Sequence, residues 1–369
     1  MKKLLFFINS LGGGGAEKVL VDLVNSLDHN KYKIDVVSVT GGVHEKRLSS
    51  KVHYYKMIKT ENKFLKKLFV KVFYHLPLSL IYKFIKKDEY DIEIAYLEGF
   101  PTRVIAAGNS KAKKLAFVHC DVSVDNIMDK LYNGKKDCLN EYDQFDRVCF
   151  VSNVAKEGFE KTVCTLQNGV VIHNMIDFES AVKRSEEEIP FEYNTNGMKL
   201  ITVGRLSAEK GNERLVKVLL ELKNEYDFEL WLLGEGDRRA SLEEMIKHST
   251  NSFKMMGFQK NPYAFMKKAD LLICPSFYEG YSTVVAESMA LGLPVLTTDC
   301  AGMNEILDNG ETGLIVDNSE EGIKSGLVTL FEDNQMYMNI KNNTENKKEL
   351  FSNKKAVKEF DDLFKEIMT

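Results

Sequence analysis

A short apolar run, KKLLFFINS at residues 2–10, leads into four consecutive glycines at residues 12–15. Residues 16–27 then carry apolar side chains at helical spacing, and a second apolar run follows at residues 32–40. A strand buried on both faces of a parallel sheet is a continuous apolar run, and a helical crossover must precede the next strand. Strand, glycine loop, helix and strand therefore predict a βαβ unit of a doubly wound parallel sheet.

The same alternation continues and then starts again after a polar segment. Further strands of the first sheet are predicted at residues 90–98, 147–152 and 170–175. Residues 180–197 are polar and rich in turn residues, and strands alternate with helices again from residue 198 onward. This pattern predicts an α/β chain of two Rossmann-like domains. We place the first domain at residues 1–179, a linker at 180–197, the second domain at 198–353, and an amphipathic helix that packs back on the first domain at about 354–369.

Length and charge limit the class of protein. The 369 residues carry a formal net charge of −4, which argues against nucleic-acid binding by bulk charge. The six cysteines have neither Cys-x-x-Cys nor zinc-finger spacing, so we expect them in apolar cores in a reducing compartment. The basic start precedes too short an apolar run for a signal peptide, and no apolar run reaches the ~20 residues of a membrane span. The sequence therefore predicts a cytoplasmic protein.

Residues 56–87 differ from the rest of the chain, because lysines alternate there with large apolar side chains and Glu61 is the only acid. Residues 1–190 carry a formal charge of +4 and the remainder −8, so the first half is the better candidate for contact with an anionic surface. One hypothesis is a basic amphipathic surface that docks on the anionic inner face of the cell membrane. The other is a pair of helices that pack on the sheet and leave their lysines in solvent. The sequence leaves both open.

Two glutamates flank a predicted helix start within PSFYEGYSTVVAESMALGLPV, residues 275–295. The strand before this stretch ends at the carboxyl edge of the sheet, where ligands bind in open α/β folds. A helix that starts near Ser282 would direct its first-turn amides at an anion. If helical geometry extends back to Gly280, Glu287 faces the same side as Glu279, about two turns deeper. Because a carboxylate accepts hydrogen bonds from vicinal hydroxyls, the pair suits a sugar nucleotide.

Basic residues follow another strand of the same domain. GRLSAEKG places Arg205 and Lys210 in the loop after the first strand, where both can neutralise phosphate. GEG at residues 234–236 and MGF, which ends at Gly257 and Phe258, follow two further strands. An aromatic ring there suits a nucleobase, although Phe258 taken alone favours core packing. Without these neighbours, the two glutamates would be assigned to solvated surface.

In this order, the motifs GRLSAEKG, LLGEG, MGF, PSFYEGYSTVVAESMALGLPV and GETGLIV resemble those of the retaining family 4 glycosyltransferases of GT-B fold. INSLGGGGAEKVL at the start is similar to the glycine loop of that family. The resemblance covers nearly the whole chain, is strongest at residues 198–320, and includes a specific E-x7-E arrangement. It implies two Rossmann-like domains that face a central cleft, with the acceptor bound by the first and the nucleotide-sugar donor by the second.

The resemblance also implies roles for individual residues. Arg205 and Lys210 would hold the donor diphosphate and stabilise the departing nucleotide. Glu279 would contact the sugar hydroxyls, and Glu287 the ribose. The predicted catalytic residues are Arg205, Lys210, Glu279 and His119, of which the last matches a histidine near the transferred sugar. Gly14 and Gly15 would approach the phosphates or the acceptor. The full set of other predicted binding residues is Gly14, Gly15, Asn174, Gly204, Gly234, Gly257, Phe258, Gly280, Tyr281, Ser282, Thr283 and Glu287.

Some of these positions carry an alternative or depart from the family pattern. His119, in AFVHCD, has the alternative of a buried core histidine at a strand end. Asn174 lies in HNMID, where many relatives have Pro-Asn-Gly-Val-Asp. Tyr281 replaces a more frequent phenylalanine.

The implied chemistry is glycosyl transfer with retention of configuration. Fixed cations can stabilise the negative charge of a departing phosphate. The chain has no Asp-x-Asp motif, and the resemblance implies neither a metal nor a cofactor. A UDP-hexose or UDP-N-acetylhexosamine donor is favoured, with GDP-mannose next. The resemblance further implies a glycan or lipid-linked glycan acceptor in surface polysaccharide biosynthesis.

Two other classes of function could share parts of this pattern. A nicotinamide-dependent dehydrogenase requires a Gly-x-Gly-x-x-Gly loop and an acid after the second strand, and LGGGGAEKVL and VVSVTGG supply neither. A sugar-nucleotide epimerase, a phosphorylase or a protein that only binds nucleotide-sugars would share the fold and most of these residues. The sequence does not separate these from a transferase.

Overall fold

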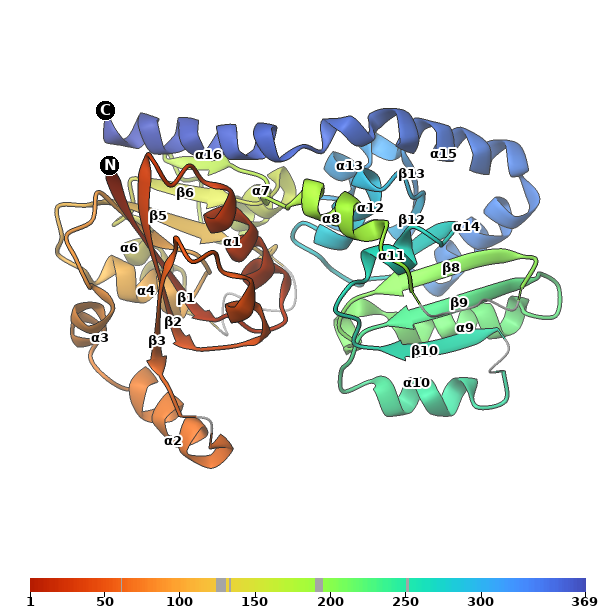
Figure 1. The fold of residues 1–369 in the computed structure, drawn as a ribbon, viewed down its shortest axis with the longest axis horizontal. Coiled ribbons are helices and arrows are strands. Elements are labelled where there is room, and N and C mark those ends of the chain that lie inside the picture. Colours follow the sequence, from red (N-terminus) through yellow and green to blue (C-terminus); the bar gives the residue numbers. More distant parts are fainter. Residues whose placement is uncertain (61, 124–130, 133, 190–194, 250–251) are drawn as a thin grey trace. The chain divides into compact units, whose positions relative to one another are not determined.

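The computed structural model describes residues 1–60, 62–123, 131–132, 134–189, 195–249 and 252–369 (Figure 1). Residue 61 of the basic segment and residues 190–194 of the expected linker lie outside the described residues. The chain divides into two compact units. Unit 1 contains Met1–Ile176 and Asn353–Thr369, and unit 2 contains Asp177–Ser352.

Unit 1 is built on a parallel sheet with seven described strands in the order β3-β2-β1-β4-β5-β6-β7. Because β1 and β4 are neighbours although two strands separate them in the chain, the sheet is doubly wound, as predicted. The strands are β1 (Lys2–Ser10), β2 (Tyr32–Thr40), β3 (His53–Ile58), β4 (Ile92–Ala95), β5 (Lys113–Val118), β6 (Arg147–Phe150) and β7 (Gly169–Val171). Its described helices of four or more residues are α1 (Gly15–Ser26), η1 (Val43–Arg47), α2 (Lys63–Tyr74), α3 (Leu78–Ile85), α4 (Phe100–Ala106), α6 (Lys135–Tyr142), α7 (Asn153–Thr162) and α16 (Asn353–Met368).

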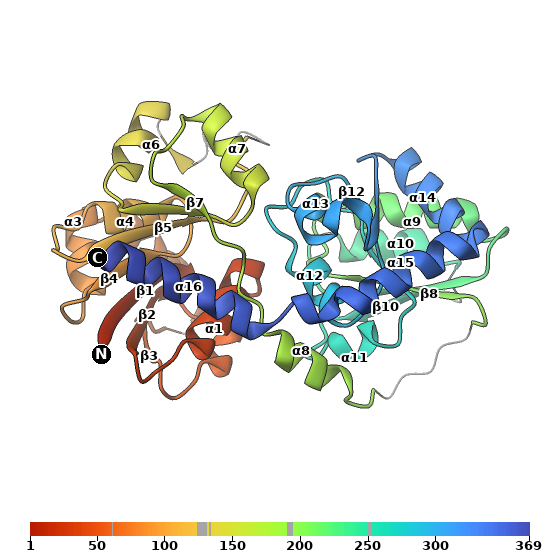
Figure 2. The ribbon, with the colours of Figure 1, turned by 90° about the horizontal axis from the view of Figure 1, so that it is seen from above.

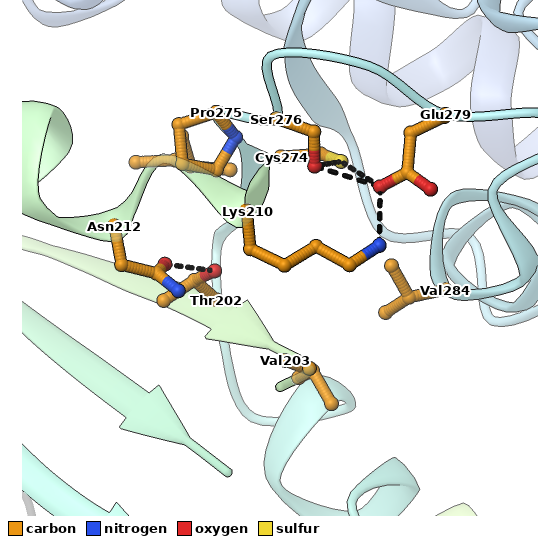
Figure 3. A pocket seen from close by; sticks show the side chains of 11 residues that line it. Thr202, Val203, Lys210, Asn212, Cys274, Pro275, Ser276, Glu279 and Val284 are labelled. Carbon is orange, nitrogen blue, oxygen red and sulfur yellow. Dashed lines mark hydrogen bonds and ion pairs between the residues drawn. The ribbon is translucent and has the colours of Figure 1, made fainter. Parts of the chain in front are cut away.

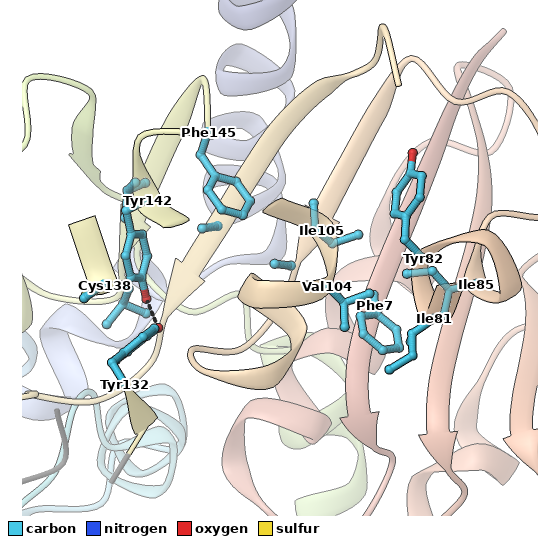
Figure 4. Close-up of a cluster of buried hydrophobic side chains, with 14 of the residues drawn as sticks. Phe7, Ile81, Tyr82, Ile85, Val104, Ile105, Tyr132, Cys138, Tyr142 and Phe145 are labelled. Atoms are coloured by element: carbon cyan, nitrogen blue, oxygen red, sulfur yellow. Dashed lines mark hydrogen bonds between the residues drawn. The ribbon is translucent and has the colours of Figure 1, made fainter. Parts of the chain in front are cut away.

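Strand alternation divides the interior of unit 1 into two cores. Leu4 and Phe6 of β1 enter the core under α1, whereas Leu5 and Phe7 enter the opposite core, because successive side chains point to opposite faces. The second core is covered by α3, α4, α6 and α7, and Figure 4 shows some of its buried side chains. Phe360 and other buried residues of α16 complete the first core, and Figure 2 shows α16 lying along unit 1.

Unit 2 repeats the architecture with six described parallel strands in the order β10-β9-β8-β11-β12-β13. The strands are β8 (Met198–Val203), β9 (Phe228–Leu233), β10 (Phe253–Gly257), β11 (Leu271–Cys274), β12 (Val295–Thr298) and β13 (Gly313–Val316). The helices are α8 (Phe178–Ser185), α9 (Asn212–Leu222), α10 (Arg239–Ile246), α11 (Tyr263–Met266), α12 (Thr283–Ala290), α13 (Met303–Ile306), α14 (Glu320–Glu332) and α15 (Asn334–Lys347). Short 3-10 turns lie at Ala208–Lys210, Asp308–Gly310 and Lys348–Leu350.

The structure differs from the sequence expectation at three elements. The strands β3 and β5 are not among the strands predicted above, since HYYKMI shows neither a continuous apolar run nor strict alternation and KKLAFV starts with two lysines. The helix α8 occupies the first part of the expected linker, where the Asp177 side chain caps it by accepting a hydrogen bond from the Ser180 amide. Its polar composition hides a buried face that contains Phe178 and Ala181.

Candidate functional site

The sheet order of unit 2 brings two loops together at its carboxyl edge. β8 pairs with β9 on one side and with β11 on the other, so the strand order reverses between β8 and β11. Open α/β sheets bind ligands in the crevice at such a switch point. The loop at residues 204–211 follows β8, and the loop at residues 275–282 follows β11. These two loops carry the predicted cation and carboxylate.

Lys210 and Glu279 meet between these loops. The Lys210 Nζ atom donates to Glu279 Oε1 over 2.7 Å, and the Ser276 hydroxyl donates to the same oxygen over 2.7 Å. Figure 3 shows the two charged side chains facing each other in a pocket at the switch point. The pocket is lined by Thr202, Val203, Gly204, Lys210, Asn212, Ile273, Cys274, Pro275, Ser276, Glu279 and Val284.

The surroundings keep the Lys210 ammonium charged. Burial lowers the pKa of Lys210, but the Glu279 carboxylate outweighs this effect, and the pKa lies above the ordinary value for lysine. The pKa of the neighbouring Cys274 thiol is raised by burial and by Glu279, so the thiol stays neutral. The pocket therefore holds a half-buried cation that is paired with a carboxylate, and a ligand could engage either group.

Sequence reasoning missed Arg214, which braces the loop that carries Glu279. Arg214, near the start of α9, is 5% exposed, and its guanidinium donates to Pro275 O at 2.9 and 2.7 Å and to Ser276 O at 2.8 Å. It also donates to Asn318 Oδ1 at 2.7 Å and lies 3.8 Å from the centre of the Phe277 ring. In sequence, Arg214 is only another charged residue in a helix, so nothing marked it.

The predicted glycines 204, 234 and 257 lie at adjacent strand ends. The Gly204 amide donates to Leu233 O at 2.9 Å, and the Gly234 amide donates to Gly257 O at 2.8 Å. Gly234 has φ of +145°, and a Cβ there would lie 1.7 Å from Gly204 O. Only glycine allows this close approach of the loops after β8 and β9. The backbone at this edge is therefore fixed by glycine next to the Lys210 pocket.

Arg205 and Phe258 lie outside the pocket. Arg205 is exposed, and no hydrogen bond or ion pair joins its side chain to another described residue. Its charge is close enough to help lower the pKa of Glu209, although burial of that carboxyl acts in the opposite direction. Phe258 is 64% exposed, so the core packing that this residue taken alone would favour is wrong. Both side chains are accessible to a ligand that extends beyond the pocket.

The helix α12 begins later than the two-turn alignment of the glutamates requires. Ser282 is its N-cap residue with extended backbone, so Gly280 and Tyr281 precede the helix and Thr283 is its first residue. Glu287 is 5% exposed, and its Oε1 accepts a hydrogen bond from the Tyr263 hydroxyl at 3.0 Å. The expectation that Glu287 and Glu279 share a side required helical geometry from Gly280 onward. The structure does not meet this condition, because α12 starts only at Thr283. Glu287 does not line the Lys210 pocket.

In unit 1, His119 directly follows β5. Its backbone amide donates to Glu98 Oε2 at 2.9 Å, and its ring lies 4.9 Å from the Tyr96 ring. Both ring nitrogens are buried and have no hydrogen-bond partner among the described residues. Burial lowers the pKa of His119 to about 4 despite the opposing effect of Glu98. His119 is therefore a neutral imidazole with two unused hydrogen-bonding atoms.

This depressed pKa predicts a loss of stability in mild acid. Unfolded His119 would protonate near pH 6.5, whereas folded His119 protonates only near pH 4, so stability falls as pH drops from 6.5 to 4. Between pH 7 and pH 5, protonation of this residue should lower the free energy of unfolding by about 2 kcal/mol. We expect His119→Gln to remove that part of the pH dependence in urea unfolding at the two pH values. Equal pH dependence in wild type and variant would contradict the assignment.

The other predicted residues of unit 1 lie at the same carboxyl edge or beyond it. Gly14 is the N-cap of α1, and Gly15 is its first residue. The Glu17 carboxylate lies over this loop, since a Cβ on Gly14 would meet Glu17 Oε2 at 2.2 Å. Asn174 is partly exposed in the segment between β7 and α8. Within unit 2, the structure thus gathers Lys210, Glu279 and the predicted glycines at one edge of the sheet.

Two further findings concern metal and cysteine chemistry. Within the described parts of the chain, no group of three His, Cys, Asp or Glu side chains is arranged to hold a metal ion. All six cysteines are free, and Cys138, Cys149 and Cys274 are buried.

Known proteins resemble the chain in sequence and in fold. Residues 183–347 match the family Glycosyl transferases group 1. A Campylobacter jejuni N-acetylgalactosamine-N,N'-diacetylbacillosaminyl-diphospho-undecaprenol 4-alpha-N-acetylgalactosaminyltransferase is 26% identical, over 97% of this chain and 98% of the relative. Anabaena HepE, solved with UDP and glucose, is 19% identical with a TM-score of 0.77 over 99% of this chain and all of the other. A Staphylococcus aureus TarM mutant, solved with fondaparinux, alpha-GlcNAc-glycerol and UDP, is 13% identical with a TM-score of 0.75, over 99% of this chain and all of that one.

The two parallel-sheet Rossmann-like units and these structural neighbours define a GT-B fold, which confirms the predicted fold class. Residues 183–347 are a domain of the family Glycosyl transferases group 1, and the chain is a glycosyltransferase of the hexosyl-transferring class.

Proposed function

We propose that this glycosyltransferase belongs to the retaining family 4 and moves a hexose or N-acetylhexosamine from a UDP-sugar to a lipid-linked glycan. In this proposal, residues 198–353 bind the donor, and residues 1–179 with the C-terminal helix bind the acceptor. The reaction would take place in the cytoplasm, at the inner face of the cell membrane, during surface polysaccharide synthesis. No metal or cofactor takes part.

The contact between Lys210 and Glu279 carries the proposal. A donor diphosphate in the pocket would draw the Lys210 ammonium away from Glu279 and leave that carboxylate to accept bonds from sugar hydroxyls. The bond between the anomeric carbon and the phosphate oxygen breaks with its electron pair on the nucleotide, and Lys210 stabilises that charge. The acceptor oxygen bonds to the same face of the anomeric carbon and passes its proton to the departing phosphate. Arg205, which is exposed nearby, would add a second cation to the diphosphate.

The remaining site residues would position the donor. Backbone amides of Gly280 to Thr283 precede or open α12, and a helix start favours a phosphate or sugar oxygen. Gly204, Gly234, Gly257 and the exposed Phe258 would border the nucleotide, and Glu287 would bind the ribose after releasing Tyr263. His119 would donate or accept a hydrogen bond at the transferred sugar, which its unpartnered ring nitrogens support. Gly14, Gly15 and Asn174 would complete the site by family resemblance.

Relatives support the choice of substrates. The name of the Campylobacter relative specifies a diphospho-undecaprenol-linked acceptor and a transferred N-acetylgalactosamine. Anabaena HepE has been solved with UDP and glucose. These names favour a UDP donor and an acceptor on a lipid carrier for this chain too, with GDP-mannose as the second donor to test.

A thermal-shift panel tests the donor class. UDP at about 100 times its Kd should stabilise the protein by about 2.7 kcal/mol, which is a rise in Tm of about 5–10 °C. GDP and ADP at the same concentration should give a much smaller shift. A larger rise in Tm with GDP than with UDP would contradict the proposed UDP-sugar donor and favour a GDP-sugar.

Product analysis tests the reaction class. Incubation with a UDP-sugar should release free UDP at an appreciable rate only when a lipid-linked glycan is present. A sugar epimer formed without an acceptor would favour an epimerase, and binding without any product would favour a nucleotide-sugar-binding protein.

A further inference from the structure

The helix α2 carries large apolar side chains on its solvent-exposed side. Phe64 is 76% exposed, Leu68 48% and Val72 52%, and Leu65 and Phe69 are also exposed. We call these five residues the apolar face of α2. Figure 1 shows α2 projecting from unit 1 beyond the end of β3. Soluble proteins seldom expose a contiguous apolar patch of this kind without a partner.

The apolar face points away from the protein. At about 100° per residue, its five members span an arc of roughly 140° on one side of the helix. Phe73, which is buried in the core, lies outside this arc, next to the partly buried Val70. The Tyr74 hydroxyl donates to Asn9 Oδ1 over 3.1 Å and so ties the end of α2 to the end of β1. The helix is thus fixed to unit 1 at its C-terminal end, with its apolar face turned to solvent.

Lysines flank this face. Lys67 and Lys71 lie on one side of the arc and Lys66 on the other, and none of them forms an ion pair with a described residue. Of the 12 residues of α2, none is acidic. Positive charge on both flanks of an apolar stripe is complementary to a layer of anionic headgroups over hydrocarbon.

The neighbouring helix α3 behaves differently. Its Ile81, Tyr82 and Ile85 are buried in the core of unit 1, and the Tyr82 hydroxyl donates to Glu93 Oε1 at 2.7 Å. The basic segment therefore divides: α3 follows the hypothesis of core packing, whereas α2 follows the hypothesis of a lipid-docking surface.

We propose that α2 docks in the plane of an anionic lipid surface, with its apolar face inserted and Lys66, Lys67 and Lys71 among the headgroups. A 12-residue helix is about 18 Å long, too short for a hydrocarbon core of about 30 Å. Among the described helices none can cross a bilayer alone, and the α2–α3 pair, which has the required composition, is bent by 117°. Because α3 is held in the core, α2 lies on the membrane rather than across it.

A second copy of the chain is a less suitable occupant. In a two-fold symmetric dimer the same patch meets itself, so the flanking lysines of the two copies would approach each other without an acid between them. An anionic lipid surface satisfies these charges and accepts the apolar side chains at the same time. The inference goes beyond the proposed transfer reaction and does not rest on it.

Flotation of the full-length protein with vesicles tests the inference. We expect binding to phosphatidylcholine vesicles that contain phosphatidylglycerol, and at least about tenfold weaker binding to pure phosphatidylcholine. Lys67→Glu with Lys71→Glu should weaken binding to the anionic vesicles at least about tenfold. Phe64→Ser with Leu68→Ser should weaken it similarly, since both side chains are exposed and the fold does not need them.

The matched control is Lys354→Glu with Lys355→Glu, which makes the same change of charge on exposed residues of α16. It should bind vesicles like the wild type. Sedimentation without vesicles should show a monomer for every variant. Wild-type protein that fails to float with anionic vesicles, or that floats equally well after both α2 changes, would overturn the inference. So would a wild-type dimer that the α2 changes dissociate. Because no nucleotide or glycan is present, these results leave the transfer reaction to its own tests.

Discussion

Replacement of Lys210 by alanine should lower kcat by about 100- to 1000-fold, the usual cost of removing one group that stabilises transition-state charge. Lys210 is the cation within the pocket at the switch point, 2.7 Å from Glu279. Without it, negative charge would develop on the departing phosphate beside a carboxylate rather than beside an ammonium. Initial rates with saturating UDP-sugar and acceptor would measure the effect.

The control is Lys217→Ala, which removes an exposed lysine of α9 that pairs with Glu320. It should leave kcat within about twofold, because exposed ion pairs contribute little. Arg205→Ala should also lower kcat, by less than Lys210→Ala, since Arg205 lies outside the pocket. Unchanged rates in both Arg205→Ala and Lys210→Ala, with folding confirmed by circular dichroism, would refute the proposed role of these cations.

Substitution of Arg214 by methionine should destabilise unit 2 by about 3 kcal/mol and lower its Tm by about 6–12 °C. The change would leave the buried carbonyl oxygen of Pro275 without the two hydrogen bonds that Arg214 donates to it, and it would remove one of the donors to Ser276 O, which keeps those of Thr298 and Cys300. Arg214→Lys should fall between wild type and Arg214→Met, because an ammonium cannot reproduce a forked set of donors. Thermal unfolding followed by circular dichroism would measure these values.

Substitution of Arg214 should also affect catalysis, by displacing the loop that carries Glu279. Arg214 fixes the loop that presents Glu279, so kcat should fall in Arg214→Lys even at temperatures where the variant is fully folded. Arg239→Met is the control, since Arg239 is a partly exposed arginine of unit 2 paired with Glu235 and Glu243. It should change Tm by no more than about 2 °C. If Arg214→Lys keeps the wild-type Tm and kcat, the loop does not depend on the guanidinium.

The contacts seen here show why some features could be predicted from sequence and others could not. The runs at β1 and β8 are apolar because both faces of those strands are buried, and such runs are visible without a structure. Lys210 and Glu279 follow strands at one sheet edge, so their encounter could be expected from topology alone. The helix start predicted near Ser282 is confirmed, since Ser282 is the N-cap residue of α12 and Thr283 its first residue, although the Ser282 side chain makes no capping hydrogen bond.

Long-range contacts limit how much of the site can be predicted from the sequence. Arg214 has its role through carbonyl oxygens about 60 residues away in the chain. Glu287 is held by Tyr263 of α11 rather than directed into the pocket. The exposure of α2 depends on how α3 and β3 pack, and a periodic apolar pattern is the same whether it faces a core or solvent.

The C-terminal helix has a consequence for the order in which the protein is made. Unit 2 is one continuous stretch of chain, but the core of unit 1 needs Phe360, Leu363, Phe364 and Ile367 of α16. During synthesis, residues 1–176 leave the ribosome long before these four side chains exist. Unit 1 therefore holds an incompletely covered sheet face, open to chaperones, until α16 emerges.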